Sequence, residues 1–107
     1  MGQLAKIVVT VSEKDADKLR EAIGNANCGK IGNYTHCSFS IKGIGRFKPE
    51  SGANPAIGEV GKLEEVLEER IEVTCEKDNL SNVITAIRSV HPYDEPAIDI
   101  YPMLLED

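Results

Sequence analysis

The side chains best suited to chemistry are two histidines and three cysteines: Cys28, His36, Cys37, Cys75 and His91. Imidazole and thiolate groups are the ligands that zinc and similar metals prefer. In an extended segment, His36 and Cys37 would point to opposite faces of a sheet, so one chain brings too few ligands together. Several copies of His36 around a symmetry axis, or His36 with Glu72 on the same sheet face, would supply enough. His36 and Glu72 are therefore candidate ligands for a divalent metal ion, and the alternative is that His36 is a polar interface residue.

Catalytic chemistry has little support in the sequence. Cys37 and Cys75 lie in segments where every second residue is apolar, which is typical of small buried side chains. A nucleophilic cysteine also needs a base within hydrogen-bond reach and a third group that orients the base, and no local motif supplies either. We therefore assign no catalytic residue and do not expect an enzyme.

Residues 43–62 contain five of the nine glycines and two of the five prolines, with no sustained helical or strand period. This composition predicts a long loop, and long loops are often functional. Arg46, Phe47 and Lys48 place an aromatic ring between two cations, which suits stacking on a base, and glycine-rich backbone amides can hold an anion. The P-loop pattern is absent. These three residues are candidates for binding a small ligand or anion, and the alternatives are that the glycines serve turns and that Phe47 anchors the loop to the core.

The segment His-Pro-Tyr-Asp-Glu-Pro at residues 91–96 is the sharpest local motif. Its two prolines rigidify the chain before the last strand, and His91 is placed to cap the preceding helix. Alternatively, Asp94 or Glu95 orients His91 in a cleft between subunits, where the pair binds a cation or a polar ligand. His91 and Glu95 are therefore candidate ligand-binding residues, together with Tyr34 on the expected sheet face.

Apolar periodicity predicts four strands and two helices in the order βαββαβ. The strands are expected over residues 4–11, 34–42, 64–75 and 97–101. The first helix follows Ser12 and breaks within residues 24–32. The second runs from near Asp78 to just before Pro92, because a residue that precedes proline avoids helical angles. Right-handed crossovers then give an α+β fold of the ferredoxin-like plait type, with a four-stranded antiparallel sheet and both helices on one face.

The face of the sheet that the helices leave uncovered is expected to be partly apolar. Its predicted members are Lys6, Val8, Thr10, Tyr34, His36, Glu68, Arg70, Glu72 and Tyr101. This mixture is too apolar and aromatic for a fully solvated surface. Self-association across this face is the natural hypothesis.

Length and charge narrow the function classes. The 107 residues suit one domain, residues 1–107, and the net charge of −6 disfavours nucleic acid as a partner. Residues 1–62 carry nine basic and six acidic residues, whereas residues 63–107 carry three and twelve, so the second part is strongly acidic. An odd number of cysteines without a CxxC pair favours reduced thiols and a cytoplasmic location, and no stretch resembles a membrane span or an export signal.

Four blocks are more specific than the fold pattern. They cover residues 29–40 (GKIGNYTHCSFS), 43–49 (GIGRFKP), 52–58 (GANPAIG) and 91–102 (HPYDEPAIDIYP). In this order they closely resemble the YqfO-type insertion domain of the Nif-three-like dinuclear metal-centre proteins. The resemblance extends from about Lys6 to Met103, which is nearly the whole chain.

The resemblance implies a PII-like or CutA-like fold, because the insertion domain is similar to those two families. They form trimers through sheet contacts and receive ligands at the long loop and in clefts between subunits. The larger Nif-three-like proteins carry their metal ligands in two other halves, which have no counterpart here, so those ligands transfer to no residue of this chain. The implied function is a small homo-oligomeric module, with a trimer favoured, that senses a small ligand or a metal ion and modulates a partner. The alternative is a metal-dependent or metal-handling protein with a composite intersubunit site built from His36, His91 and acidic residues.

Overall fold

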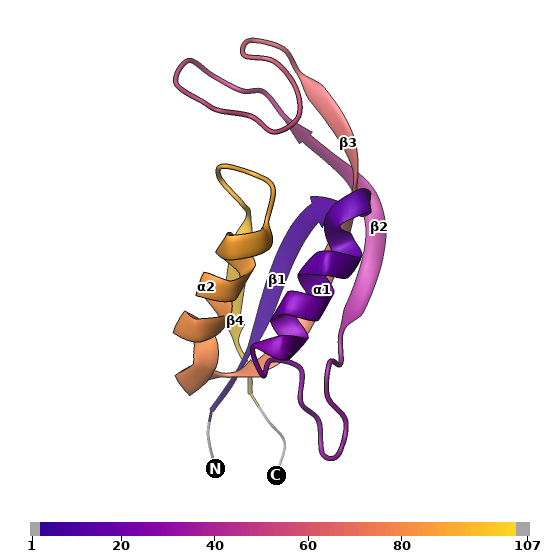
Figure 1. The fold of residues 1–107 in the computed structure, drawn as a ribbon, viewed down its shortest axis with the longest axis vertical. Coiled ribbons are helices and arrows are strands. Elements are labelled where there is room, and N and C mark those ends of the chain that lie inside the picture. Colours follow the sequence, from indigo (N-terminus) through magenta and orange to yellow (C-terminus); the bar gives the residue numbers. More distant parts are fainter. Residues whose placement is uncertain (1–2, 105–107) are drawn as a thin grey trace.

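A computed structural model describes residues 3–104 of the chain. The elements follow in the order β1 (Leu4–Ser12), α1 (Ala16–Asn25), β2 (Phe39–Phe47), β3 (Glu64–Glu76), α2 (Leu80–Val90) and β4 (Ile98–Pro102), with short 3-10 turns before both helices. All paired strands are antiparallel, in the order β2-β3-β1-β4. Both helices lie on one face of this sheet (Figure 1). The predicted α+β ferredoxin-like plait is confirmed.

One hydrophobic core lies between the sheet and the two helices. Alternate residues of the central strands point into it, as the period of two requires. Its largest fully buried side chains are Ile7, Val9, Val11, Leu19, Ile23, Ile71, Val83 and Ile87. The helical members recur at spacings of three and four, so each helix buries a single face. Neither helix within residues 3–104 has the length and apolar character needed to cross a membrane.

The second strand begins five residues later than expected, at Phe39 instead of residue 34. The N–H of Gly29 donates to the carbonyl of Thr74, and the N–H of Cys37 donates to the carbonyl of Gly29, so the intervening chain is tied down as a loop beside β3. Tyr34 lies in this loop, where it pairs with Ile31 in an isolated bridge. The prediction of a strand over residues 34–42 was therefore wrong at its start.

Two consequences follow for the uncovered face of the sheet, which we call the open face. Tyr34 and His36 do not belong to it, because the backbone of His36 is left-handed, with φ at 59°, and lies outside the strand. Phe39 and Ile41 do belong to it, since they pair with Glu72 and Arg70 rather than with core residues. Two apolar side chains of β2 therefore lie on the side of the sheet that the helices leave uncovered.

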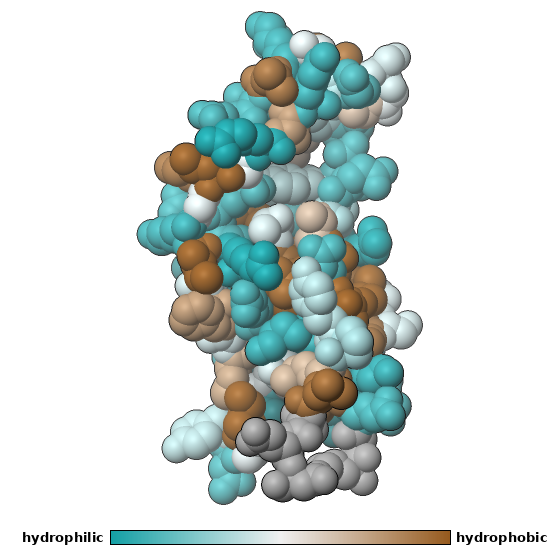
Figure 2. All heavy atoms as spheres, turned by 180° about the vertical axis from the view of Figure 1, so that it is seen from behind, coloured by the Kyte–Doolittle hydropathy of each residue, from teal (hydrophilic) through white to brown (hydrophobic). Residues whose placement is uncertain are grey.

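Figure 2 shows the molecule from behind the helices, where brown hydrophobic side chains alternate with teal hydrophilic ones. Phe39, Ile41 and Tyr101 are about half exposed or more on this side, at 63%, 49% and 49%. Val8 lies at the centre of the open face and is buried between its strand neighbours Glu72 and Asp99. The predicted apolar character of this face is confirmed, with Phe39 and Ile41 replacing Tyr34 and His36.

Strands β2 and β3 continue past the helices as a protruding hairpin that we call the arm (Figure 1). The pairing runs to Phe47 opposite Glu64, and residues 48–63 form the loop at its tip. The expected loop over residues 43–62 was thus too long at its start, because Gly43 and Gly45 are part of the strand. The arm explains the elongated shape of 49 × 24 × 22 Å.

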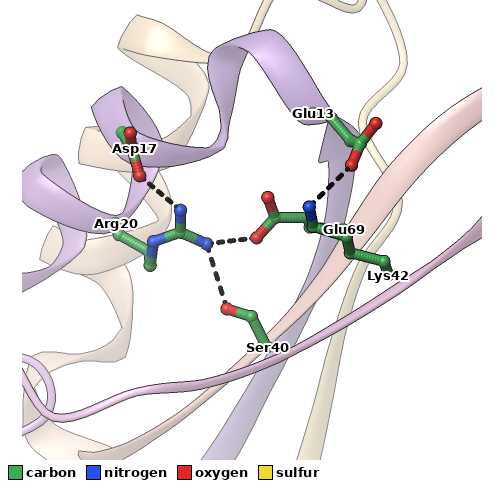
Figure 3. Close-up of polar contacts among 6 residues, drawn as sticks. All are labelled: Glu13, Asp17, Arg20, Ser40, Lys42 and Glu69. Carbon is green, nitrogen blue, oxygen red and sulfur yellow. Dashed lines mark hydrogen bonds and ion pairs between the residues drawn. The ribbon is translucent and has the colours of Figure 1, made fainter.

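Helix α1 is fixed to the base of the arm by a cluster of charged groups (Figure 3). The Arg20 guanidinium donates to the carboxylates of Asp17 and Glu69, at 2.5 Å each, and to the hydroxyl of Ser40 at 3.0 Å. Glu69 and Ser40 belong to β3 and β2, so one side chain connects the helix to both strands of the arm.

Candidate functional site

A cleft of about 400 Å³ lies between the arm and the turn at residues 91–97. One wall is the end of β2 and the following loop, including Arg46, Phe47 and Lys48. The opposite wall is formed by Tyr93, Asp94 and neighbouring residues of the turn. Clefts of this size are typical places for small molecules to bind.

A hydrogen bond between the two walls forms the floor of the cleft. The Tyr93 hydroxyl donates to a Glu68 carboxylate oxygen at 2.7 Å. Burial raises the pKa of Tyr93 above its ordinary value, and the hydrogen bond to Glu68 and the charge of Glu68 raise it further. The phenol is therefore a neutral donor at physiological pH.

Gly45 makes room for this floor. A Cβ atom built at Gly45 would lie 1.9 Å from Oε1 of Glu68, closer than van der Waals contact permits. Any larger residue would displace the carboxylate from its position beneath Tyr93. The glycine that resembled a loop signal in the sequence is thus a strand residue selected for close approach.

A second bond joins the loop at the tip of the arm to the turn. The backbone N–H of Asn54 donates to a carboxylate oxygen of Asp94 at 3.0 Å, and both residues are exposed. This contact joins residues 40 positions apart in the sequence, and the bond between Tyr93 and Glu68 joins residues 25 positions apart.

His91 supports the turn from below. Its Nε2 donates to the carbonyl of Thr10 at 2.8 Å, and its Nδ1 accepts the N–H of Tyr93 at 3.2 Å, which requires the neutral ring with the proton on Nε2. The ring also packs edge-on against Tyr93, with centroids 4.8 Å apart. The His91 backbone N–H caps helix α2 through the carbonyl of Ile87. Because both ring nitrogens already have protein partners, the geometry gives His91 the role of positioning Tyr93.

The two cations of the cleft are each close to a carboxylate. Arg46 Nε donates to Glu65 at 2.8 Å, and Lys48 Nζ lies 3.9 Å from Glu50. All four side chains are largely exposed, so these pairs are solvated and weak.

The structure brings together some of the candidate residues and separates others. Arg46, Phe47, Lys48 and Glu95 all line the cleft, and His91 lies directly behind Tyr93. Tyr34 is 74% exposed in the loop before β2 and does not line the cleft.

The two candidate metal ligands lie in different places. His36 packs over Gly24 at the end of α1, where its ring nitrogens contact Asn25 and Thr35 at 2.9 and 3.0 Å. Glu72 lies on the open face and pairs with Arg70 at 3.0 Å. The expectation that one sheet face holds both residues was wrong. In residues 3–104, no group of three or more His, Cys, Asp or Glu side chains could hold a metal ion.

The cysteines are placed as small hydrophobic residues. Cys28 and Cys75 are buried next to each other, and Cys37 is half-buried. Burial raises the pKa of the Cys28 thiol, and the neighbouring Cys75 thiol raises it further. A buried thiol is a poor nucleophile, so the burial of Cys75 agrees with the expectation for that residue, whereas Cys37 is less buried than expected.

Glu68 and Tyr93 are the cleft residues that sequence reasoning missed. Tyr93 lies within the motif at residues 91–96, so the signal was present but was assigned to its neighbours. Glu68 is one of several acids in a strand. The register pairs it with Gly43, and only the position of its side chain in the folded chain brings its carboxylate beside Gly45.

No protein-family model matches the chain. The chain is 48% identical over 103 residues to the GTP cyclohydrolase 1 type 2 homolog of Halalkalibacterium halodurans, covering 96% of this chain and 28% of the relative. Its fold matches a Bacillus cereus protein related to NIF3 with a TM-score of 0.83 at 41% identity, over 95% of this chain and 26% of that one. The chain is thus similar over nearly its whole length to one part of NIF3-related proteins, and for that similarity we call it the NIF3-type domain. The family resemblance of the four sequence blocks is thereby confirmed, and this NIF3-type domain spans about a quarter of the length of the curated relatives it matches.

The NIF3-type domain also has the fold of the CutA1 proteins. It matches the divalent ion tolerance protein CutA1 from Ehrlichia chaffeensis with a TM-score of 0.72 at 16% identity, covering 100% of this chain and 87% of that one. At this identity the likeness shows a shared fold. The predicted CutA-like architecture is therefore confirmed, and the chemistry of the cleft must be argued from the domain's own residues.

Proposed function

We propose that this NIF3-type domain is a binding module for a small ligand and that the ligand binds in the cleft between the arm and the turn at residues 91–97. The observation that carries the proposal is the cleft of about 400 Å³, which brings together Arg46, Phe47, Lys48 and Glu95 from two distant segments. Ligand contacts on both walls would favour the arrangement in which the walls are close.

The same arrangement supports a sensing role. The contact of the loop at residues 48–63 with the turn through Asn54 and Asp94 is exposed, and exposed hydrogen bonds open readily. A ligand that bridges the walls would shift the loop toward the closed position by as much as it binds that position better. A partner protein that contacts the loop would then detect whether the cleft is occupied.

The relatives' printed name concerns much longer proteins. More than two thirds of the Halalkalibacterium halodurans relative has no counterpart in this chain. Within residues 3–104, the cysteines are buried or half-buried, and no group of three or more His, Cys, Asp or Glu side chains could hold a metal ion. Our proposal for this chain is therefore binding and not cyclohydrolase activity.

We further propose that the domain is a homo-oligomer that associates through the open face. Phe39, Ile41 and Tyr101 expose apolar area there that a second copy would cover. Ile44 and Leu67 are exposed cross-strand neighbours in the arm. They add apolar area on the face of the arm opposite to the open face. A trimer is the assembly that the family resemblance implies.

The alternative is a metal site shared between copies of the chain. Within one copy, His36 lies beside the end of α1 and Glu72 lies on the open face, so the two cannot bind one ion together. Additional ligands would have to come from other subunits. The name of the CutA1 neighbour, a divalent ion tolerance protein, is the observation that keeps this alternative under test.

Native mass spectrometry tests these proposals with protein purified without a tag or chelator. A retained small molecule adds mass that disappears on denaturation, and the same spectrum counts the subunits and reveals a metal ion. Ala56 lines the cleft, so Ala56→Trp should fill it and abolish retention. Ser51→Trp is the matched control, because Ser51 is exposed in the same loop and does not line the cleft. Equal retention by both variants would contradict the proposed site.

A further inference from the structure

The charges that line the cleft are unbalanced. Two are positive and four are negative: Arg46, Lys48, Glu50, Glu68, Asp94 and Glu95. Arg46 is also engaged by Glu65, which lies outside the lining, at 2.8 Å. The cleft therefore has a net negative lining, although sequence reasoning had selected it for its cations.

The hydrogen bonds in the cleft leave this charge in place. Glu68 accepts from the neutral Tyr93 hydroxyl, and Asp94 accepts from the backbone N–H of Asn54. Neither donor carries a positive charge, so neither hydrogen bond adds a positive charge to the cleft. Glu95 takes part in no ion pair among the described residues, and its side chain is exposed. A ligand that enters thus meets carboxylates on the floor and on the wall formed by the turn.

The rest of the lining is apolar or aromatic. Phe47 at the end of β2 and Tyr93 in the turn contribute aromatic rings, and Pro55, Ile57 and Ala97 contribute aliphatic surface. Aromatic faces attract cations, and aliphatic surface binds the uncharged body of a ligand. The aromatic rings thus favour a positively charged group, as the carboxylates do, and the aliphatic surface favours an uncharged body attached to that group.

Building on the proposed function of the cleft, we propose that its ligand is a small organic cation, with an ammonium or guanidinium group carried on an apolar or aromatic body. The positive group lies toward Glu68 and Glu95, and the apolar body lies against Phe47 and Ile57. A nucleotide or another polyanion would meet a net negative lining, so the anion-binding expectation from Arg46 and Lys48 is not favoured for this cleft.

Three probes with the same indole ring and similar chain length separate charge from shape: tryptamine, tryptophol and indole-3-propionate, which are cationic, neutral and anionic. Binding is followed by the backbone amide NMR signals of residues 45–57 and 93–97 in the full chain. We expect tryptamine to shift these signals and to bind at least about tenfold more tightly than indole-3-propionate, and this preference should shrink as salt is added.

Glu95→Gln removes one cleft charge with little change in shape and should weaken tryptamine binding by about threefold, as expected for an exposed pair. Glu76→Gln is the matched control. Glu76 is an exposed residue at the C-terminal end of β3 and does not line the cleft, so this variant removes the same charge outside the proposed site. Tryptophol affinity should be the same in both variants.

Equal binding of the three probes in the cleft, or a preference for indole-3-propionate, would overturn the cation proposal and leave the cleft as a ligand site. Absence of cleft shifts with every probe would also overturn it. The proposed function is decided separately, by the retained mass in Ala56→Trp and Ser51→Trp.

Discussion

Replacing His91 by alanine distinguishes a residue that positions the cleft from a residue that binds ligand. The imidazole is 8% exposed, and its two nitrogens bond to the carbonyl of Thr10 and the N–H of Tyr93. Thr10 lies one residue beyond Val9, where the pairing of β1 with β4 ends. His91 therefore supplies a donor for the Thr10 carbonyl just beyond the point where β4 stops pairing with β1.

The magnitude follows from the contacts that alanine removes. Each of the two hydrogen bonds contributes about 1 kcal/mol to the free energy of unfolding, and the edge-on packing against Tyr93 contributes about 1 kcal/mol more. We expect His91→Ala to lower the free energy of unfolding by about 3 kcal/mol. His91→Gln retains an amide donor near Thr10 and should recover about 1 kcal/mol of this loss.

Urea unfolding at a fixed protein concentration measures the effect, since the midpoint should fall while the slope stays constant. Arg88→Ala is the control, because Arg88 is exposed near the end of the same helix and should change the free energy of unfolding by less than about 0.5 kcal/mol. If His91→Ala were as stable as this control and yet lost the retained ligand mass, our reasoning would be refuted, and His91 would be a ligand-binding residue.

Three further predictions concern other contacts. Arg20→Met leaves the partly buried Glu69 without its cation and should lower the free energy of unfolding by about 2 kcal/mol in a urea titration; an unchanged midpoint would show that the cluster adds nothing. Gly24→Ala should lower the free energy of unfolding although alanine has the better helix propensity, because the new Cβ would lie 2.0 Å from the His36 ring. Adding His36→Ala removes the clash and should restore stability. Equal losses in the single and the double variant would exclude this explanation. The raised pKa of Tyr93 means that, as the pH rises, the phenol loses its proton in the unfolded chain before it does so in the folded chain. The free energy of unfolding should therefore fall as the pH rises above the ordinary tyrosine value of about 10. The urea midpoint of Tyr93→Phe should fall less steeply over this range, and an equal slope for both proteins would contradict the argument.

The fold was predictable wherever a segment buries one face. Strands β1 and β3 and both helices present apolar residues at the period of their own structure, and their expected positions agree with the observed ones to within a few residues. Strand β2 lacks this signal because it lies at the edge of the sheet and its apolar residues Phe39 and Ile41 are exposed. The alternation in residues 34–42 does not show where the strand begins or which of its faces meets the helices. The choice was made by long-range bonds from Gly29 and Cys37, which no local pattern records.

The same error propagated to the candidate site. Placing His36 on the open face beside Glu72 depended on the early start of β2, and the left-handed turn at His36 removes that premise. By contrast, Arg46, Phe47 and Lys48, which their glycine-rich surroundings marked as candidates for ligand binding, lie together on one wall of the cleft, and their binding of a ligand stays a prediction. The net negative charge of the cleft lining was not predicted, because Glu68 comes from β3, where the sequence shows it only as one of several acids.

The position of the cleft determines how the domain can be used. The N–H of Met103 donates to the carbonyl of Leu4, and β1 pairs with β4, so the two ends of the described chain leave the sheet side by side (Figure 1). The cleft lies toward the opposite end, between the arm and the turn that precedes β4. Residues attached before β1 or after β4 would therefore extend away from Tyr93 and Glu68. Because the cleft and its supporting contacts from Thr10 and His91 all come from this one chain, ligand measurements on the isolated chain address the cleft directly.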